Sequence, residues 1–163
     1  MSLNSRFPTR NVSLCLIAML AQSSVSWAPA QTQRGKGAGV DDAAPLFQEY
    51  RSVRIGMPVE EVRKKLTNPN DKSDEQDFFI FSDNETAQVF YDKTHKVYAI
   101  SANYLTGARD IPTAKLVLGA DIPAKPDGSM HKMVRYAKAG YWVSFSRTAG
   151  DSPLVTVTLQ KID

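Results

Sequence analysis

The chain has 163 residues, of which 42% are hydrophobic and 23% charged, with a formal net charge of +3 and one cysteine, Cys15. This length suits a single hydrophobic core, and a lone cysteine cannot form an internal disulfide, so the domain's stability must come from apolar packing. No dense run of Lys and Arg provides the electrostatic footprint of a nucleic-acid or membrane-surface binder. Neither is expected as a partner.

Residues 1–30 predict a cleavable secretory signal. Arg6 and Arg10 precede an apolar stretch over residues 12–20, and Ala28-Pro29-Ala30 has the small-x-small pattern of a cleavage site. The stretch is about half of the roughly 20 residues that a membrane span requires. We expect cleavage after Ala30, export to the periplasm or beyond the cell, and no transmembrane segment in the mature chain. An uncleaved amino-terminal anchor is the alternative.

Cleavage there would leave 18 basic and 17 acidic side chains, a net charge of +1, and no cysteine. The next segment, residues 31–44, has three glycines among polar residues and no apolar period. Such a composition predicts a flexible tether. The folded domain is therefore expected over residues 45–163.

Two helices are predicted before residue 70. The first follows from Leu46, Tyr50 and Val53, which lie at i, i+4 and i+7. The second begins at Pro58, has glutamates in its first turn and lysines in its last, and ends before the Asn-Pro-Asn sequence at residues 68–70.

Alternating apolar residues predict six strands, joined in part by short polar connections that favour antiparallel hairpins. A further short helix is expected over residues 112–118. The predicted strands cover residues 77–82, 87–91, 97–104, 130–136, 141–147 and 154–162.

The two halves of the domain can be aligned at an offset of 54 residues, since Pro112 is 54 positions after Pro58 and Val143 is 54 positions after Val89. The offset predicts a tandem duplication of a helix-plus-three-strand unit, with pseudo-repeats at 45–106 and 107–163. Neither half can bury its own sheet, so the two should share one layer. The predicted fold class is α+β, with helices packed on one face of an antiparallel sheet.

A family resemblance lies between residues 50 and 104, in the sequences YRSVRIGMPVEEVRKKLTNP, FFIFS, AQVFYD and KVYAISANY. These resemble the BamE/SmpA/OmlA-like bacterial outer-membrane assembly-factor family, whose fold is shared with the tandem-repeat β-lactamase inhibitory protein. The shared features are an Ile-Gly-Met entry to the helix, a proline break after it, and a strand ending in an aromatic residue and Asp, here Tyr91 and Asp92. Thr67 stands where the family usually has glycine. The resemblance implies the fold and a bacterial envelope setting.

The sequence offers few groups for catalysis. His95 and His131 have no His or Cys partner at metal-ligand spacing, and no serine has the glycines of a nucleophile elbow. The acidic run at residues 71–77 lacks the turn glycine of a calcium loop, because Gln76 stands in its place. We expect no catalytic residues, no metal and no cofactor.

Strand alternation predicts which side chains face the core and which remain uncovered. The predicted core consists of Val89, Tyr91, Tyr98, Ile100, Val134, Tyr136, Tyr141, Val143, Phe145, Val155, Val157 and Leu159. On the other face, aromatic, Met and Arg side chains among hydroxyl residues have the composition of a protein interface. The candidate binding residues there are Phe90, Met133, Arg135 and Trp142.

The orientation of one strand is ambiguous, because residues 78–81 are apolar on both sides and alternation cannot assign a face. The interpretation of the uncovered face is also open, since single exposed apolar residues are ordinary and the tether could cover them.

The resulting hypothesis is an exported, non-enzymatic module of the bacterial envelope that binds a protein partner. The alternatives are a secreted inhibitor of an extracellular enzyme, or a small carbohydrate-binding or hydrolase domain in which Trp142 and Phe90 contact sugar rings.

Overall fold

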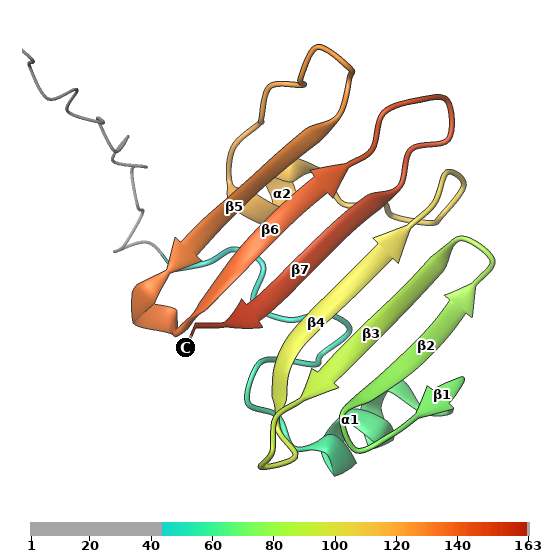
Figure 1. Ribbon diagram of the computed structural model, residues 1–163, viewed down its shortest axis with the longest axis vertical. Coiled ribbons are helices and arrows are strands. Elements are labelled where there is room, and N and C mark those ends of the chain that lie inside the picture. Colours follow the sequence, from blue (N-terminus) through green and yellow to red (C-terminus); the bar gives the residue numbers. More distant parts are fainter. Residues whose placement is uncertain (1–43, 163) are drawn as a thin grey trace, which may run out of the picture. The chain divides into compact units, whose positions relative to one another are not determined.

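The computed structural model describes residues 44–162. Its seven strands form one antiparallel sheet in the order β1-β2-β3-β4-β7-β6-β5 (Figure 1). The elements, in chain order, are α1 (Val59–Leu66), β1 (Asp71–Lys72), β2 (Gln76–Ser82), β3 (Glu85–Tyr91), β4 (Val97–Tyr104), α2 (Ala114–Leu118), β5 (Met130–Tyr136), the 3-10 turn η1 (Ala137–Ala139), β6 (Tyr141–Arg147) and β7 (Val155–Lys161). The predicted signal at 1–30 and nearly all of the predicted tether at 31–44 lie outside the described residues.

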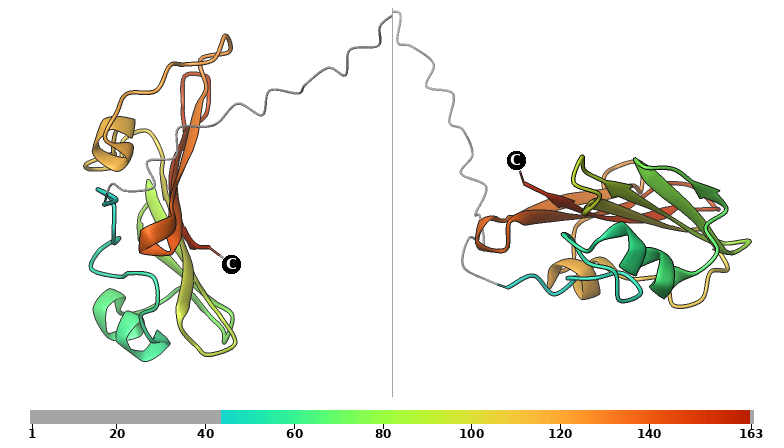
Figure 2. Two further views of the ribbon diagram at one scale, coloured as in Figure 1. Left: turned by 90° about the vertical axis from the view of Figure 1, so that its left-hand side faces the viewer. Right: turned by 90° about the horizontal axis from the view of Figure 1, so that it is seen from below.

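The predicted fold class, with helices packed as a layer on the sheet, is wrong. Helices α1 and α2 have only 8 and 5 residues, so the fold is dominated by its sheet. Irregular segments lie on the same side of the sheet as both helices and cover much of that face (Figure 2). One of them, residues 105–129, contains three prolines and three glycines, which restrict helix formation to the short α2.

The helix expected around Leu46, Tyr50 and Val53 does not form. Tyr50 and Val53 instead exchange two backbone hydrogen bonds, of 2.9 and 2.8 Å, across a tight turn. The two residues between them adopt positive φ angles of 47° and 65°. Both ends of this turn point into the core, while Leu46 is 66% exposed. The helix prediction failed because Tyr50 and Val53, the two buried ends of the turn, are three positions apart, a spacing that also occurs on one face of a helix.

Helix α1 forms where it is predicted, with Pro58 as its N-cap residue and Val62 and Leu66 buried. Strands β4, β5 and β6 have the predicted bounds, and the other long strands differ from prediction by one or two residues at an end. The two halves of the chain meet where β4 pairs with β7. The proposed pseudo-repeats remain a prediction from the sequence offset.

The core lies between the sheet and the segments on its helical side. It contains most of the predicted residues, together with Val53, Met57 and Phe79. Tyr98 is a correction, because it is only half-buried and its ring lies 6.1 Å from that of Phe90 on the other face. The cause is an irregularity in the register, in which Phe90 pairs with Ala99 and Tyr91 with Val97, leaving Tyr98 unpaired with β3.

Candidate functional site

The face of the sheet opposite the helices, called here the open face, carries side chains in three rows that cross the six long strands from β2 to β5. The first row is Gln76, Phe90, Ala99, Gln160, Trp142 and Arg135. The second row is Phe78, Gln88, Ser101, Thr158, Ser144 and Met133. The third row is Ile80, Thr86, Asn103, Thr156, Ser146 and His131.

All four predicted binding residues lie on the open face, but they do not form one cluster. Trp142 and Arg135 are direct cross-strand partners, and Met133 lies one row away on the same strand as Arg135. Phe90 belongs to the same row as Trp142, yet β4 and β7 lie between their strands. Three strand spacings of about 4.8 Å therefore separate them. Phe90 instead contacts Tyr98, which sequence reasoning had assigned to the core.

The ambiguous strand β2 directs Phe78 and Ile80 to the open face, and Phe79 into the core. Ile80 is 51% exposed. The signal for this orientation is Asp77, because its buried charge is satisfied only on the helical side, by α1. The sequence of β2 alone could not show this, because the partner of Asp77 is Arg63, which belongs to α1. The open face is thus more apolar than the predicted residues alone indicated.

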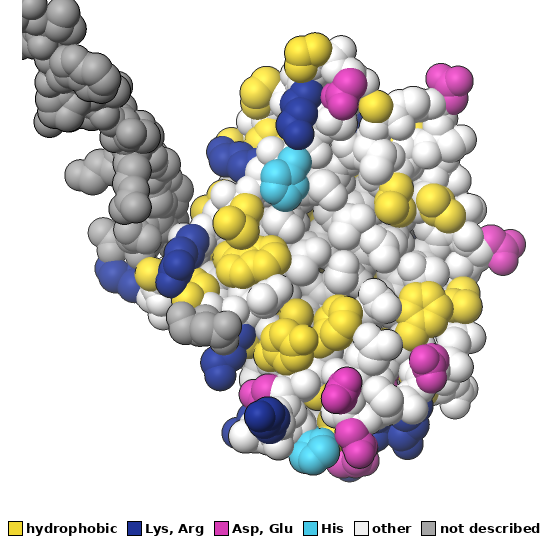
Figure 3. Space-filling model, in the orientation of Figure 1, with side chains coloured by type: hydrophobic (Ala, Val, Ile, Leu, Met, Phe, Trp, Pro, Cys, Tyr) yellow, Lys and Arg dark blue, Asp and Glu magenta, His cyan; other side chains and the backbone are white. Residues whose placement is uncertain are grey.

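The middle of the open face is uncharged and rich in short polar side chains. Thr156 donates a 2.8 Å hydrogen bond to Asn103, and the hydroxyls of Ser101 and Thr158 lie 3.4 Å apart. Figure 3 shows this pale polar area, with hydrophobic side chains crossing the sheet below it and Lys and Arg side chains along the β5 margin. The face therefore combines an apolar band, a neutral polar area and a cationic margin.

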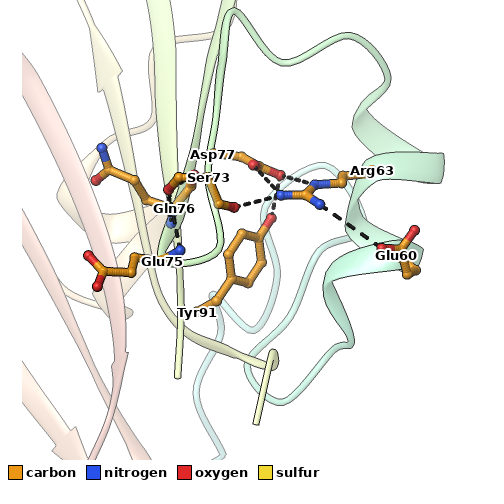
Figure 4. A network of polar contacts seen from close by, with 7 residues as sticks. All are labelled: Glu60, Arg63, Ser73, Glu75, Gln76, Asp77 and Tyr91. Carbon is orange, nitrogen blue, oxygen red and sulfur yellow. Dashed lines mark hydrogen bonds and ion pairs between the residues drawn. The ribbon is translucent and has the colours of Figure 1, made fainter. Parts of the chain in front are cut away.

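Beneath the opposite face, a buried polar network fixes α1 to the sheet (Figure 4). The Arg63 guanidinium donates two 2.9 Å hydrogen bonds to the Asp77 carboxylate, and the Tyr91 hydroxyl donates a third of 2.8 Å. The hydrogen bonds with Asp77 raise the pKa of Arg63, and burial raises the pKa of Tyr91. Each polar group of this network has a partner within it, so the network fixes α1 to the sheet without leaving a buried charge unpaired.

A second network binds the turn at residues 50–53 to β3. Glu85 accepts hydrogen bonds of 2.8 Å from the Tyr50 hydroxyl and 2.8 Å from Arg51. The Arg51 guanidinium also lies 4.1 Å from the centre of the Phe81 ring, within the range of a cation–π contact. These contacts explain why the turn at residues 50–53, which has no regular secondary structure, packs against the sheet.

One end of the open face borders an open groove of about 700 Å³. Phe90 and Tyr98 form its aromatic wall, and Glu75, Asp92 and His95 are among its polar lining. Asp92 accepts hydrogen bonds from the Thr94 side chain and backbone, and the side-chain bond lowers the pKa of Asp92. Within residues 44–162, no three His, Cys, Asp or Glu side chains are grouped closely enough to hold a metal ion.

No family model, curated protein or solved structure matches this chain. The resemblance to the outer-membrane assembly factors therefore remains a prediction from the residues that carry it. In the part of the chain that the structure describes, neither helix has the length and apolar character of a membrane span.

Proposed function

We propose that this protein is a non-enzymatic protein-binding module and that the open face is its binding surface. One observation carries the proposal: large apolar side chains from five of the six long strands, exposed or half-buried, lie on the sheet face without helices. Those side chains are Phe78, Ile80, Phe90, Tyr98, Met133 and Trp142. An extended apolar surface of this kind is more typical of an interaction site than scattered exposed residues are.

The chemistry of the β5–β6 end supports Trp142 and Arg135 as the principal contacts. Trp and Arg dominate the binding energy of many protein interfaces, and here they are cross-strand neighbours with Met133 beside them. The polar middle of the face is also suited to burial. Its short polar side chains can hydrogen-bond to one another, as the Thr156 hydroxyl does to the Asn103 amide oxygen, so a partner that covers them leaves fewer unpaired donors.

The proposed setting is the bacterial cell envelope or the space outside the cell. The support is the secretory pattern of residues 1–30 and the resemblance to envelope assembly factors. A chain without cysteine after cleavage also suits an oxidising compartment, since its core requires no controlled thiol chemistry.

The test is affinity capture from an envelope extract of the source bacterium, followed by a binding measurement with the purified partner. Trp142→Ala and Arg135→Ala should each weaken binding by about tenfold or more, which is typical of interface hot spots. Lys64→Ala is the matched control, because Lys64 is exposed on α1, on the opposite side of the sheet. Equal affinity of all three variants for the captured partner would exclude the open face as its binding surface.

A carbohydrate ligand is the second candidate, favoured by the groove at the end of the open face. The Phe90 and Tyr98 rings are 6.1 Å apart and inclined by 48°. They lie next to carboxylate and amide side chains that could accept hydrogen bonds from sugar hydroxyls. Glycan titrations should then depend on Phe90 and not on Arg135. A protein partner whose binding depends on Trp142, with no response to glycans, would reject this candidate.

A further inference from the structure

The two edges of the sheet differ in how well their backbones are protected. At one edge, β1 pairs with residues 77 and 78 of β2, and Asn70 continues the protection. The Asn70 backbone N–H donates a 2.8 Å hydrogen bond to the Phe78 carbonyl oxygen, and the Asn70 side-chain oxygen accepts a 2.7 Å hydrogen bond from the Ile80 backbone N–H. At the other edge, β5 is seven residues long and pairs, among the described residues, with β6 alone. The β5 edge is thus the better template for an additional strand.

This edge also carries a distinct charge pattern. Lys132 and Arg135 are both exposed and form no ion pair within residues 44–162. Strands β5 and β6 contain no acidic residue at all. The two cations are on opposite faces, because Arg135 belongs to the open face and Lys132 lies at the alternate position. A strand added at this edge would meet positive charge on both of its sides.

We propose that the β5 edge binds an extended segment of a partner protein by strand addition, and that this segment carries the pattern acid-apolar-apolar-acid. The proposal rests on the proposed function, since it specifies how a protein partner engages this module. In a paired strand, the residues opposite Lys132 and Arg135 would be the acids, and those opposite Met133 and Val134 would be apolar. The pattern reads the same in both directions, so it holds for parallel and antiparallel addition.

Two other occupants of this edge are less compatible with its charges. A second copy pairing through its own β5 would bring Lys132, Arg135 and their counterparts together, and like charges on adjacent strands are destabilising. Residues 31–43 of the same chain contain Arg34 and Lys36, and their only acids, Asp41 and Asp42, are adjacent instead of three positions apart. An acidic segment from another protein fits the edge best.

The probe is a fluorescent octapeptide with the sequence Thr-Thr-Glu-Val-Val-Glu-Thr-Thr. It is titrated at low salt into the protein purified in its naturally processed form. It should bind about tenfold or more tightly than two matched peptides, one with Lys-Val-Val-Lys and one with the same composition reordered as Glu-Glu-Val-Val. Amide hydrogen exchange should slow in residues 130–136. N-methylation of alternate peptide amides on the pairing edge should abolish binding, because it removes the ladder hydrogen bonds.

Charge reversal supplies the matched protein variants. Lys132→Glu with Arg135→Glu should invert the preference, so that the Lys-Val-Val-Lys peptide binds better. Lys64→Glu with Lys115→Glu makes the same change in net charge on the exposed surfaces of the two helices and should leave the preference unchanged.

Equal binding of the three peptides, no binding of any, protection outside β5, or a dimer that occupies the edge would each overturn strand addition. The open-face proposal fails separately, on the insensitivity of a captured partner to Trp142→Ala and Arg135→Ala.

Discussion

Arg63 and Asp77 form a bidentate ion pair beneath α1, with both nitrogen–oxygen distances at 2.9 Å and the Asp77 side chain fully buried. The pair connects helix α1 to strand β2 and, through the Tyr91 hydroxyl, to β3. Because Asp77 occupies the inward position, this contact also determines that Phe78 and Ile80 face outward. The orientation of the open face thus depends on a buried charge on the opposite side of the sheet.

We predict that Arg63→Leu lowers the free energy of unfolding by about 3–5 kcal/mol, because it leaves the Asp77 carboxylate buried without its cation. The triple variant with Asp77→Val and Tyr91→Phe should recover most of that loss, because no buried charge or hydroxyl then lacks a partner. Urea unfolding of both variants measures the difference. If the triple variant is no more stable than Arg63→Leu, the lost contacts and not the uncompensated charge are responsible.

A second prediction concerns alkaline pH. Burial, aided by the nearby Glu85 charge, raises the pKa of Tyr104 from 10.0 to about 12 in the folded protein. The folded state therefore holds the phenolic proton more tightly than the unfolded state does. Its contribution to stability is complete below pH 10 and is lost as the pH rises from 10 to about 12.

Replacement of Tyr104 by Phe removes this titration and leaves the ring in place. Tyr104→Phe should consequently lose less stability than the parent between neutral and strongly alkaline pH. The measurement is the free energy of unfolding of both proteins across that range. Parallel pH profiles would show that the Tyr104 proton is held equally in both states.

The assignment of the two sheet faces predicts opposite outcomes for neighbouring residues in β7. Leu159 is fully buried, whereas Thr158 lies in the middle of the open face. Leu159→Ala should cost about 2–5 kcal/mol of stability through a core cavity, and Thr158→Ala less than about 1 kcal/mol. Chemical denaturation distinguishes them directly. Similar losses for both residues would mean that the face called open is packed against something.

A fourth prediction tests the end of α2. Gly119 terminates this helix with a left-handed φ of 80°, and a Cβ added there would lie 3.3 Å from a methyl carbon of Leu46. Gly119→Ala should therefore destabilise the protein by about 1 kcal/mol or somewhat more. Gly128 has a similar φ of 84° but nothing within 4 Å of the added carbon. Gly128→Ala therefore measures the cost of the backbone conformation alone. The additional loss of stability in Gly119→Ala, in the same unfolding assay, is the cost of the contact with Leu46.

The candidate site was partly predictable from the sequence because strand alternation is a local property. In β6, the alternate positions of Trp142, Val143, Ser144 and Phe145 already separate one face from the other, and the structure agrees. Which open-face residues are neighbours is not local. Trp142 lies beside Arg135 and far from Phe90 because β7 pairs with β4, and that pairing joins residues more than 50 positions apart.

By itself, the sequence determined where α1 and the long strands lie, to within two residues at each end, since helix signals at Pro58 and two-residue alternation act over a few positions. Only the tertiary structure decided that the fold is dominated by its sheet, that residues 50–53 form a turn, and that Tyr98 leaves the core. The physical reason is that each of these outcomes depends on partners distant in the chain. Glu85 holds the turn, and the register between β3 and β4 displaces Tyr98.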